Sequence, residues 1–568
     1  MLRAPSHASA GPKALATVGL PLPITGVTCI IVGTPAQSGV LRGRGARATT
    51  VLAAIAGRLS RRRGARGAPK RARAATALVW FRTDLRVDDN PTLGRAVELM
   101  GKGHCVAALP VYVLDPLHFC NTPLGSPKTG AFRAKFVLEC LEGLKQQLRG
   151  LGSELLVLTG PTEKRLAELS ERVGAAVVLT EQQVADEERR MDQRVRAAIA
   201  PLGADLEEVW GNTLYHLADL PFSGGLRNLP NVFTPFKEKC ERQAGLRPPA
   251  GPPARGSLPL PAASLPELGV MPSWADLPFA EPVSEPTVDP RSAFRLRGGE
   301  AAAAARLKHY LWDTDRITEY FKIRNGMLGS EYSTKLSASL AQGCISARRI
   351  QHEVARYERE RTKNKSTYWV TFELIWRDFF RFFAMKHGNR IFQLRGTAGI
   401  QKQWSTDPEA LQRWKDGTTG WPLVDANMRE LKETGWMSNR GRQNVASYLA
   451  LDLKLDWRAG ADHFESLLVD YDVTSNWGNW VAAAGLSGGR VNKFNLTKQA
   501  KDYDASGEYV RTWVPELKGL RGRGVHEPWA LGPAQLERLG AAEYPSRLTA
   551  ADVAAADPPL GGSTSRQP

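Results

Sequence analysis

The sequence is most informative at residues 470–480, which read Asp470-Tyr471-Asp472-Val473-Thr474-Ser475-Asn476-Trp477-Gly478-Asn479-Trp480. Two carboxylates and an amide lie here within an otherwise apolar region that is predicted to be helical. Burying these groups is costly unless each one meets a partner, and Arg442 is the candidate partner of Asp470. The Asn476 amide can donate or accept a hydrogen bond, so it suits a ring nitrogen that changes its protonation. The stretch therefore predicts a buried polar site inside a helical domain.

Tryptophan is concentrated in the second half of the chain. Twelve of the fifteen tryptophans follow residue 300, in a segment whose apolar pattern is helical from about residue 298 to 520. Packing in a core is the more common role for any single tryptophan. Indole is also easily oxidised, so a series of tryptophans can conduct an electron between a redox cofactor and the surface. We predict an all-helical domain over residues 298–530.

Residues 76–215 alternate short apolar runs with amphipathic stretches. The predicted strands are 77–81, 106–113, 155–159, 176–180 and 206–210. The predicted helices are 130–149, 162–173 and 186–200. Buried strands that alternate with helices favour a doubly wound parallel sheet. No Gly-x-Gly-x-x-Gly follows the first strand, so the common dinucleotide loop is not expected.

The positive charge of the chain is concentrated at its N-terminus. Residues 1–75 contain thirteen Lys or Arg and no Asp or Glu, and without them the formal net charge falls from +18 to +5. A basic, hydroxyl-rich segment without acids is typical of an organelle transit peptide. We expect targeting to the chloroplast, with the mitochondrion as the alternative. A disordered basic arm that binds polyanions is the other interpretation.

Two further segments are expected to lack regular structure. Residues 216–297 are interpreted as an interdomain linker, wrapped over the surface or partly disordered, because residues 244–290 contain twelve prolines. Residues 531–568 are predicted to form a disordered tail. No stretch is long and apolar enough to span a membrane. The cysteines and histidines show no spacing typical of a disulfide framework or a metal site.

A hydroxyl-rich cluster precedes a helix-like run at residues 338–341. It reads Ser333-Thr334-Lys335-Leu336-Ser337. Hydroxyls and free N–H groups at a helix N-terminus, with a lysine beside them, can bind phosphate. An ordinary helix cap is the equally common alternative.

A second cluster combines a carboxylate, an aromatic ring and a guanidinium. Glu373, Trp376 and Arg377 are three and four positions apart, so they share one helix face. Such a face can hold a planar polar heterocycle. A surface ion pair beside a packed tryptophan is the alternative.

Five strings in order along the chain resemble the signature motifs of the photolyase/cryptochrome family. They are Val79-Trp80-Phe81-Arg82-Thr83-Asp84-Leu85-Arg86, Thr334-Lys335-Leu336-Ser337, Glu373 to Arg381, Thr434 to Arg442 and Asp470 to Trp480. Residues 477–480, followed by 497–504, resemble the cryptochrome DASH branch. The resemblance implies a photolyase-type α/β domain on the antenna side (76–215), the linker, and a helical FAD-binding domain.

The resemblance implies a bent FAD in the helical domain. The matching cofactor-binding positions are Tyr320, Ser333, Thr334, Lys335, Leu336, Ser337, Arg377, Arg442, Asp470, Asp472 and Asn476. Of these, 333–337 match the diphosphate-binding turn, and Asn476 matches the residue that faces flavin N5. Asp470 and Asp472 match acidic positions near the flavin ring and ribityl chain, with Arg442 as the salt-bridge partner.

The resemblance also implies catalytic and substrate-binding residues. Trp404, Trp457 and Trp480 match a three-tryptophan electron chain, with Trp480 nearest the flavin and Trp404 outermost. The positions that match a pocket for a flipped pyrimidine dimer are Glu373, Trp376, Arg377, Asn439 and Gln443. Glu373 is expected to stabilise the dimer radical anion by a hydrogen bond, and Asn439 is the second predicted catalytic residue that contacts it.

The implied activity is light-driven electron transfer from reduced FAD to cyclobutane pyrimidine dimers in single-stranded DNA. RNA is a further candidate ligand, and a monomer is expected. The alternative function is a signalling blue-light photoreceptor with little repair, whose partner the sequence does not identify. A tryptophan-rich helical protein without flavin is the third interpretation.

Two positions depart from the family pattern. Ala482 stands where repair-competent relatives usually carry an aromatic residue against the dimer, and a lost stacking contact weakens binding by roughly 1–3 kcal/mol. Residues 180–184 (Thr-Glu-Gln-Gln-Val) stand where the branch usually has a carboxylate that contacts a methenyltetrahydrofolate antenna. The expected 5,10-methenyltetrahydrofolate is therefore less firmly implied than FAD.

Overall fold

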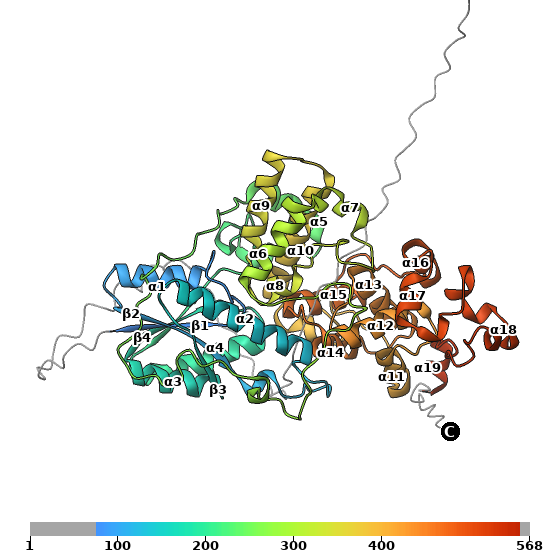
Figure 1. Cartoon of the computed structure of the whole chain (residues 1–568), viewed down its shortest axis with the longest axis horizontal. Helices are drawn as coiled ribbons and strands as arrows, with labels where there is room; N and C mark the ends of the chain where they lie inside the picture. Colours follow the sequence, from blue (N-terminus) through green and yellow to red (C-terminus); the bar gives the residue numbers. More distant parts are fainter. Residues whose placement is uncertain (1–74, 557–568) are drawn as a thin grey trace, which may run out of the picture.

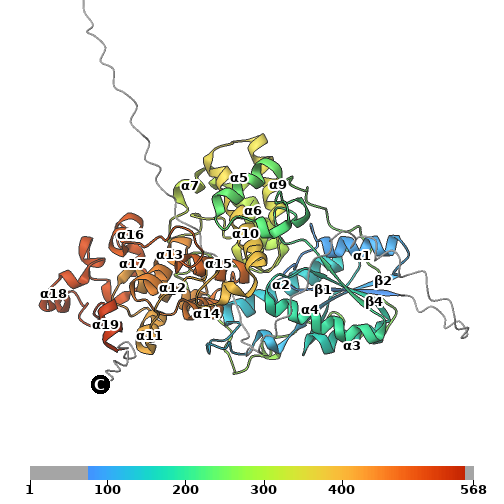
Figure 2. The ribbon, with the colours of Figure 1, turned by 180° about the vertical axis from the view of Figure 1, so that it is seen from behind.

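The computed structural model describes residues 75–556. Nearly all of the expected transit peptide, and residues 557–568 of the expected tail, lie outside this range. The described chain comprises an α/β part and a helical part that adjoin along one side (Figure 1). The C-terminal helices lie at the end of the molecule farthest from the sheet, as Figure 1 and Figure 2 both show.

The N-terminal part is built on a five-stranded, fully parallel sheet of order β3-β2-β1-β4-β5. Its strands are β1 (Thr76–Phe81), β2 (Ala107–Leu114), β3 (Leu156–Thr159), β4 (Ala175–Glu181) and β5 (Asp205–Val209). Its helices are α1 (Pro91–Gly101), α2 (Ala131–Gly150), α3 (Thr162–Val173) and α4 (Asp186–Ile199). The predicted doubly wound sheet is confirmed, although α1 was not singled out in the sequence.

Side chains of β1 alternate between two cores. Val79 and Phe81 pack with residues of α1 and α2, whereas Leu78 and Trp80 pack with residues of α3 and α4. All six residues of β1 are buried. A central strand that is covered on both faces must be apolar throughout, which explains why its sequence shows no polar alternation.

The linker is packed onto the α/β part. Leu258 is 1% exposed, and the Ala108 N–H of β2 donates to the Pro259 carbonyl over 2.8 Å. Prolines lack an N–H group but keep the carbonyl, so a proline-rich segment can still accept such bonds. The linker also contains α5 (Phe233–Gln243), which the sequence pattern did not predict. Residues 258 and 259 thus lie against the α/β part.

The second part is helical, as predicted. Its longer helices are α6 (Glu300–Lys308), α9 (Ala347–Glu360), α10 (Lys365–His387), α11 (Pro408–Asp416), α12 (Pro422–Thr434), α13 (Asn439–Ser447), α14 (Trp457–Leu467), α15 (Val473–Ala483) and α16 (Leu496–Tyr503). Its shorter helices are α7 (Tyr320–Ile323), α8 (Ser337–Ala341), α17 (Glu508–Trp513), α18 (Pro533–Arg538) and α19 (Ala550–Ala556). Within residues 75–556, none of the helices combines the length and apolarity that crossing a bilayer requires.

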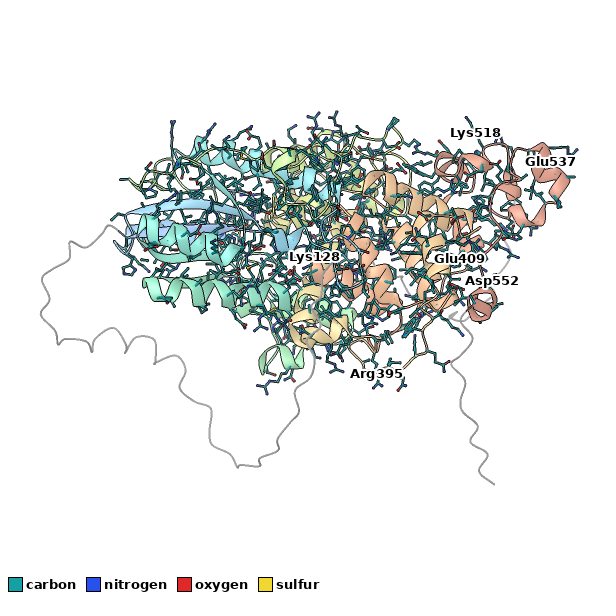
Figure 3. All side chains as sticks on the ribbon, turned by 90° about the horizontal axis from the view of Figure 1, so that it is seen from below. Lys128, Arg395, Glu409, Lys518, Glu537 and Asp552 are labelled. Carbon is teal, nitrogen blue, oxygen red and sulfur yellow. The ribbon has the colours of Figure 1, made fainter. Side chains whose placement is uncertain are left out.

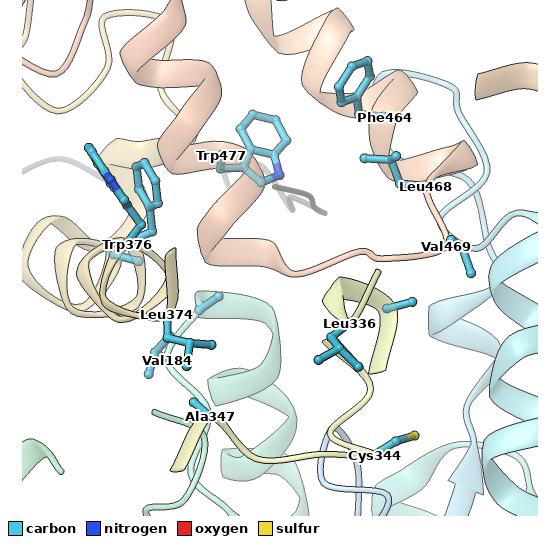
Figure 4. Packing of buried hydrophobic residues seen from close by; sticks show 14 of the residues in the cluster. Val184, Leu336, Cys344, Ala347, Leu374, Trp376, Phe464, Leu468, Val469 and Trp477 are labelled. Carbon is cyan, nitrogen blue, oxygen red and sulfur yellow. The ribbon is translucent and has the colours of Figure 1, made fainter. Parts of the chain in front are cut away.

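Helices α10 and α15 pack closely at the centre of this part. A Cβ atom at Gly478 would overlap the ring of Phe380, so glycine is needed for the two helices to approach. α10 begins with a capping box between Asn364 and Thr367, and α15 begins at the N-cap Asp472. Figure 4 shows Trp376 of α10 and Trp477 of α15 within the surrounding apolar core.

The two parts share buried contacts. Asp378 of α10 is fully buried and accepts hydrogen bonds from the backbone N–H groups of Leu214 (3.0 Å) and Tyr215 (2.7 Å). Cys344 donates to the thiol of Cys140 in α2 over 3.3 Å, although the two cysteines are 204 positions apart. The helical part is therefore fixed against the sheet by polar groups as well as by apolar packing.

The expected disordered tail is wrong for residues 531–556. The Tyr544 hydroxyl donates to the buried carboxylate of Asp425 over 2.6 Å, and the Trp421 indole donates to the Leu548 carbonyl over 3.1 Å. Tyr544 and Leu548 thus hold this segment to the helical part. Composition could not reveal these contacts, because they depend on the partners Asp425 and Trp421, more than a hundred residues earlier.

Candidate functional site

A cavity of about 1170 Å³ opens into the helical part. Most of the predicted site residues line it, namely Tyr320, Ser333, Thr334, Lys335, Leu336, Ser337, Glu373, Trp376, Arg377, Asn439, Arg442, Asp470 and Asp472. They come from α7, the turn before α8, α10, α13 and the segment before α15. Residues separated by as many as 152 positions are thus brought to one site.

The turn before α8 has a distinctive backbone and charge. Lys335 has a φ of 57°, in the left-handed region that a lysine seldom adopts. Arg306 binds the carbonyls of Ser333 (3.1 Å) and Thr334 (3.0 Å). The Lys335 Nζ lies 3.2 Å from the centre of the Tyr332 ring and has no hydrogen-bond partner. Burial lowers the pKa of Lys335 well below its usual value.

Two other buried donors in the cavity also lack partners. The Ser337 hydroxyl makes no hydrogen bond, and α8 has no side-chain cap. Arg442 pairs with Asp470 through Nη2 (2.8 and 3.0 Å), as predicted, but its Nη1 is unpartnered. Buried polar groups normally have partners. These donors, together with Lys335, fit an anionic ligand such as a diphosphate.

Glu373 is the carboxyl group of the cavity with the most perturbed titration. Its Oε1 accepts hydrogen bonds from the Trp369 indole (3.1 Å) and from Arg324 (3.2 Å). Burial raises the pKa of Glu373 to about 7, against the opposing effect of Arg324. The sequence analysis missed both partners. Trp369 lies four residues before Glu373 on α10, so helical spacing could have revealed it, whereas Arg324 comes from a separate segment.

Asp472 and Arg377 lie together in the wall of the first cavity. Asp472 Oδ1 accepts from the N–H groups of Thr474 and Ser475, both over 2.9 Å, and so caps α15. Burial alone would raise the pKa of Asp472, but Arg377, Arg381 and these hydrogen bonds lower it overall. Arg377 lies 3.9 Å from Asp472. The carboxylate therefore stays ionised inside the protein.

Two predicted residues lie outside this cavity. Asn476 is fully buried, its Nδ2 donates to the Ala461 carbonyl over 3.1 Å, and its Oδ1 has no partner. Gln443 lines a smaller hollow of about 340 Å³ together with Ala482 and Phe494. Gln443 lies one turn after Asn439 on α13 but borders this smaller hollow, whereas Glu373, Trp376, Arg377 and Asn439 line the large cavity.

The three tryptophans of the expected chain also lie outside the cavity. Trp480 and Trp457 are fully buried, whereas Trp404 is half-buried. The segment that carries Trp404 pairs with the segment before Trp457, since the Ser405 N–H donates to the Lys454 carbonyl over 2.8 Å. Trp404 is the most exposed of the three tryptophans.

Other aromatic rings accompany these tryptophans. Trp457 contacts Trp477, with ring centres 5.6 Å apart, and Trp480 contacts Trp414 at 6.2 Å and Phe464 at 5.2 Å. The Gly460 backbone of α14 lies against Trp480, where a Cβ atom would overlap the indole. Helix α14 therefore carries Trp457 at its beginning and lies against Trp480 one turn later, and both indoles belong to the same apolar core.

A second cavity, of about 1350 Å³, lies between the sheet and the helical part. Ala341 and Asp472 line both cavities. Gln183 lines the second one beside Glu187 and Glu188, and burial raises the pKa of Glu188 to about 7. Carboxyl groups are thus present in this cavity, beyond the stretch 180–184 that departs from the family pattern.

Comparisons with known proteins identify both parts. Residues 369–557 match the family described as the FAD binding domain of DNA photolyase, and residues 77–254 match DNA photolyase. The cryptochrome DASH, chloroplastic/mitochondrial, of Ostreococcus tauri is 49% identical over 490 residues, covering 83% of this chain and 89% of the relative. The cryptochrome DASH of Gloeobacter violaceus is 47% identical over 467 residues, covering 82% of this chain and 90% of the relative.

Solved structures agree. The crystal structure of a cryptochrome from Synechocystis sp. has a TM-score of 0.78 and 41% identity, covering 85% of this chain and 98% of that one. A class III photolyase from Agrobacterium tumefaciens has a TM-score of 0.70 and 26% identity, covering 85% and 97%. With two matching domains and close relatives over most of its length, the chain belongs to the photolyase/cryptochrome family, in the cryptochrome DASH branch.

Proposed function

We propose that the protein repairs cyclobutane pyrimidine dimers in single-stranded DNA, using blue light absorbed by FAD. The observation that carries the proposal is the placement of Glu373. Its carboxyl group has a pKa of about 7 and shares one cavity with Trp376 and Asn439. It can therefore hold a proton for an acceptor atom at neutral pH.

FAD, when bound, supplies the photoexcitable electron donor. We propose that residues 333–337 hold its diphosphate, because Lys335 and Ser337 line the cavity and their donor atoms have no hydrogen-bond partner. The ion pair of Arg442 with Asp470, together with Tyr320, Arg377 and Asp472, would surround the rest of the molecule. Asn476, with an unpartnered Oδ1 behind the cavity, is proposed to accept from the flavin N5–H.

We propose the second cavity as the site of the antenna chromophore. Its volume and its carboxyl groups Glu187 and Glu188 support a folate such as 5,10-methenyltetrahydrofolate, with Gln183 in place of the usual acid. Because Asp472 lies in the walls of both cavities, the two chromophores would be close neighbours.

The cofactor assignments predict the chromophores that unfolding releases. One FAD per chain and a folate should be recovered, with absorbance spectra as the measurement. Lys335→Met keeps the length of the side chain but removes the cation, so it should weaken FAD binding about ten-fold or more. Folate content is the internal control and should not change. An FAD affinity in Lys335→Met equal to that of the wild type would contradict the role of Lys335. Release of FAD without a folate would contradict the antenna assignment.

We propose that Trp480, Trp457 and Trp404 carry an electron inward in series. Trp480→Phe preserves the buried shape but raises the cost of oxidation, so photoreduction of bound FAD should slow at least about ten-fold. Trp529→Phe is the matched control, because Trp529 packs against Trp421, away from this cluster. The measurement is the flavin absorbance under blue light. Wild-type photoreduction in Trp480→Phe would exclude this order.

The repair proposal predicts a pH dependence. The pKa of Glu373 is raised, so its O–H donor is present below about pH 7 and is lost as the pH rises through 7. Repair of dimers in single-stranded DNA should fall about ten-fold between pH 6 and pH 8. Glu373→Gln keeps a donor at every pH, so its profile should be flat.

Duplex DNA and RNA substrates serve as comparisons in the same assay. Repair should be poor in duplex, because the flipped base must first be unpaired. A profile that stays unchanged in Glu373→Gln would show that Glu373 is not the donor. The absence of repair on any substrate would favour the alternative function, a signalling photoreceptor. Ala482, which leaves a hollow beside Gln443, is the observation that favours this alternative.

We infer that residues 1–75 direct the protein to the plastid. Their basic, acid-free composition supports organelle targeting, and the Ostreococcus relative is named chloroplastic/mitochondrial. A fluorescent reporter fused to residues 1–75 should collect in plastids. Collection in mitochondria would assign the other organelle, and a cytosolic reporter would contradict targeting altogether.

A further inference from the structure

Two stretches of the chain without acidic residues lie side by side near Trp404. Neither residues 379–406 nor residues 473–501 contain Asp or Glu. The Ala398 N–H donates to the Leu486 carbonyl over 3.0 Å, which joins the stretches. The two segments therefore form a continuous surface that lacks negative side chains of its own.

Four cations of these stretches have no acidic partner, whereas Lys493, farther along the second stretch, pairs with Asp452 over 2.8 Å. Arg390, Arg395 and Arg490 are exposed, and Lys402 is half-buried and donates to the Ala484 carbonyl over 2.6 Å. Across residues 75–556, no ion pair involves any of these four side chains. We refer to these four residues as the basic face. Arg395 points outward at the rim of the molecule in Figure 3.

Exposed aliphatic side chains lie among these cations. Leu394 and Ile400 are each 36% exposed, and Val491 is 43% exposed. The side chains of Val491 and Lys402 both lie close to Gly485. A Cβ atom added to this glycine would be 2.7 Å from Val491 and 3.0 Å from the Lys402 Nζ. Apolar side chains with charged residues around them are typical of protein–protein interfaces. Binding to a nucleic-acid backbone requires cations but no apolar contact.

The basic face lies next to Trp404 and Trp457. The Lys402 Nζ lies 5.9 Å from the centre of the Trp404 ring, and the Trp457 indole donates to the Leu394 carbonyl over 3.3 Å. Trp404 is the most exposed of the three tryptophans. A protein bound to this face would therefore sit next to the outer end of the aromatic series.

We propose that the basic face docks an acidic one-electron carrier protein that reduces Trp404. This proposal rests on the inward electron transfer proposed above. After the series has given an electron inward, Trp404 lacks one electron. The carrier is oxidised by one electron, and the Trp404 radical cation is reduced to the neutral indole, without transfer of atoms. Lys402 and Arg395 attract the carrier, and Leu394 and Val491 contact its surface.

The first test is binding in the dark, with an acidic plant-type [2Fe–2S] ferredoxin as the probe and the full-length protein as the partner. Binding should weaken steeply with salt, because opposite charges attract over a short screening length. Arg395→Glu should raise the Kd about ten-fold at low salt, and Leu394→Ser should raise it at all salt concentrations. Lys518→Glu is the matched control, an exposed charge reversal on another side of the helical part (Figure 3), and should bind normally.

The second test is blue-light-driven oxidation of the reduced probe, compared with the dark rate. Arg395→Glu should slow it and Lys518→Glu should not. Trp480→Phe should abolish the light-driven step but leave dark binding intact, so failure of the electron series is distinguishable from failure of docking.

Two outcomes would overturn the proposal. The first is a Kd for the ferredoxin that is the same in wild type, Arg395→Glu and Leu394→Ser. The second is binding of a single-stranded oligonucleotide that depends on Arg395 and displaces the ferredoxin, which would assign the basic face to nucleic acid.

Discussion

The close approach of α10 and α15 is the constraint on which the site depends. Gly478 allows the Phe380 ring to lie against the α15 backbone, where any side chain would overlap it. α10 carries Glu373, and α15 carries Trp480. The same contact therefore fixes the cavity wall and the inner end of the aromatic series. A wider spacing between α10 and α15 would move the Glu373 carboxyl group away from the Trp480 indole.

Sequence reasoning predicted most of the architecture because its signals are local. The apolar runs gave the five strands, and the Arg442–Asp470 pair followed from the cost of burying a carboxylate. The left-handed Lys335 and the Arg324 partner of Glu373 depend on segments that meet only in the fold. No periodicity in one segment can reveal such a contact.

Tertiary packing also accounts for the order of the tail and for the position of Gln443. Composition suggested disorder over residues 531–556, yet Tyr544 completes the hydrogen bonds of the buried Asp425. Gln443 was grouped with Glu373 by resemblance, but it lines a separate hollow with Ala482 and Phe494. A motif specifies which residues belong to a site, whereas packing decides which of them share a wall.

The unpartnered groups explain why this helical part would need its ligand. Lys335, Ser337 and Arg442 each leave a buried donor without a hydrogen bond, and each such group costs roughly 1–3 kcal/mol. Burial also shifts Lys335 toward its neutral form. A diphosphate would supply acceptors to Lys335 and Ser337 and restore the lysine charge, so its binding would stabilise the fold by linkage. The residues that destabilise the ligand-free protein are thus the ones that select an anionic, dinucleotide-sized cofactor.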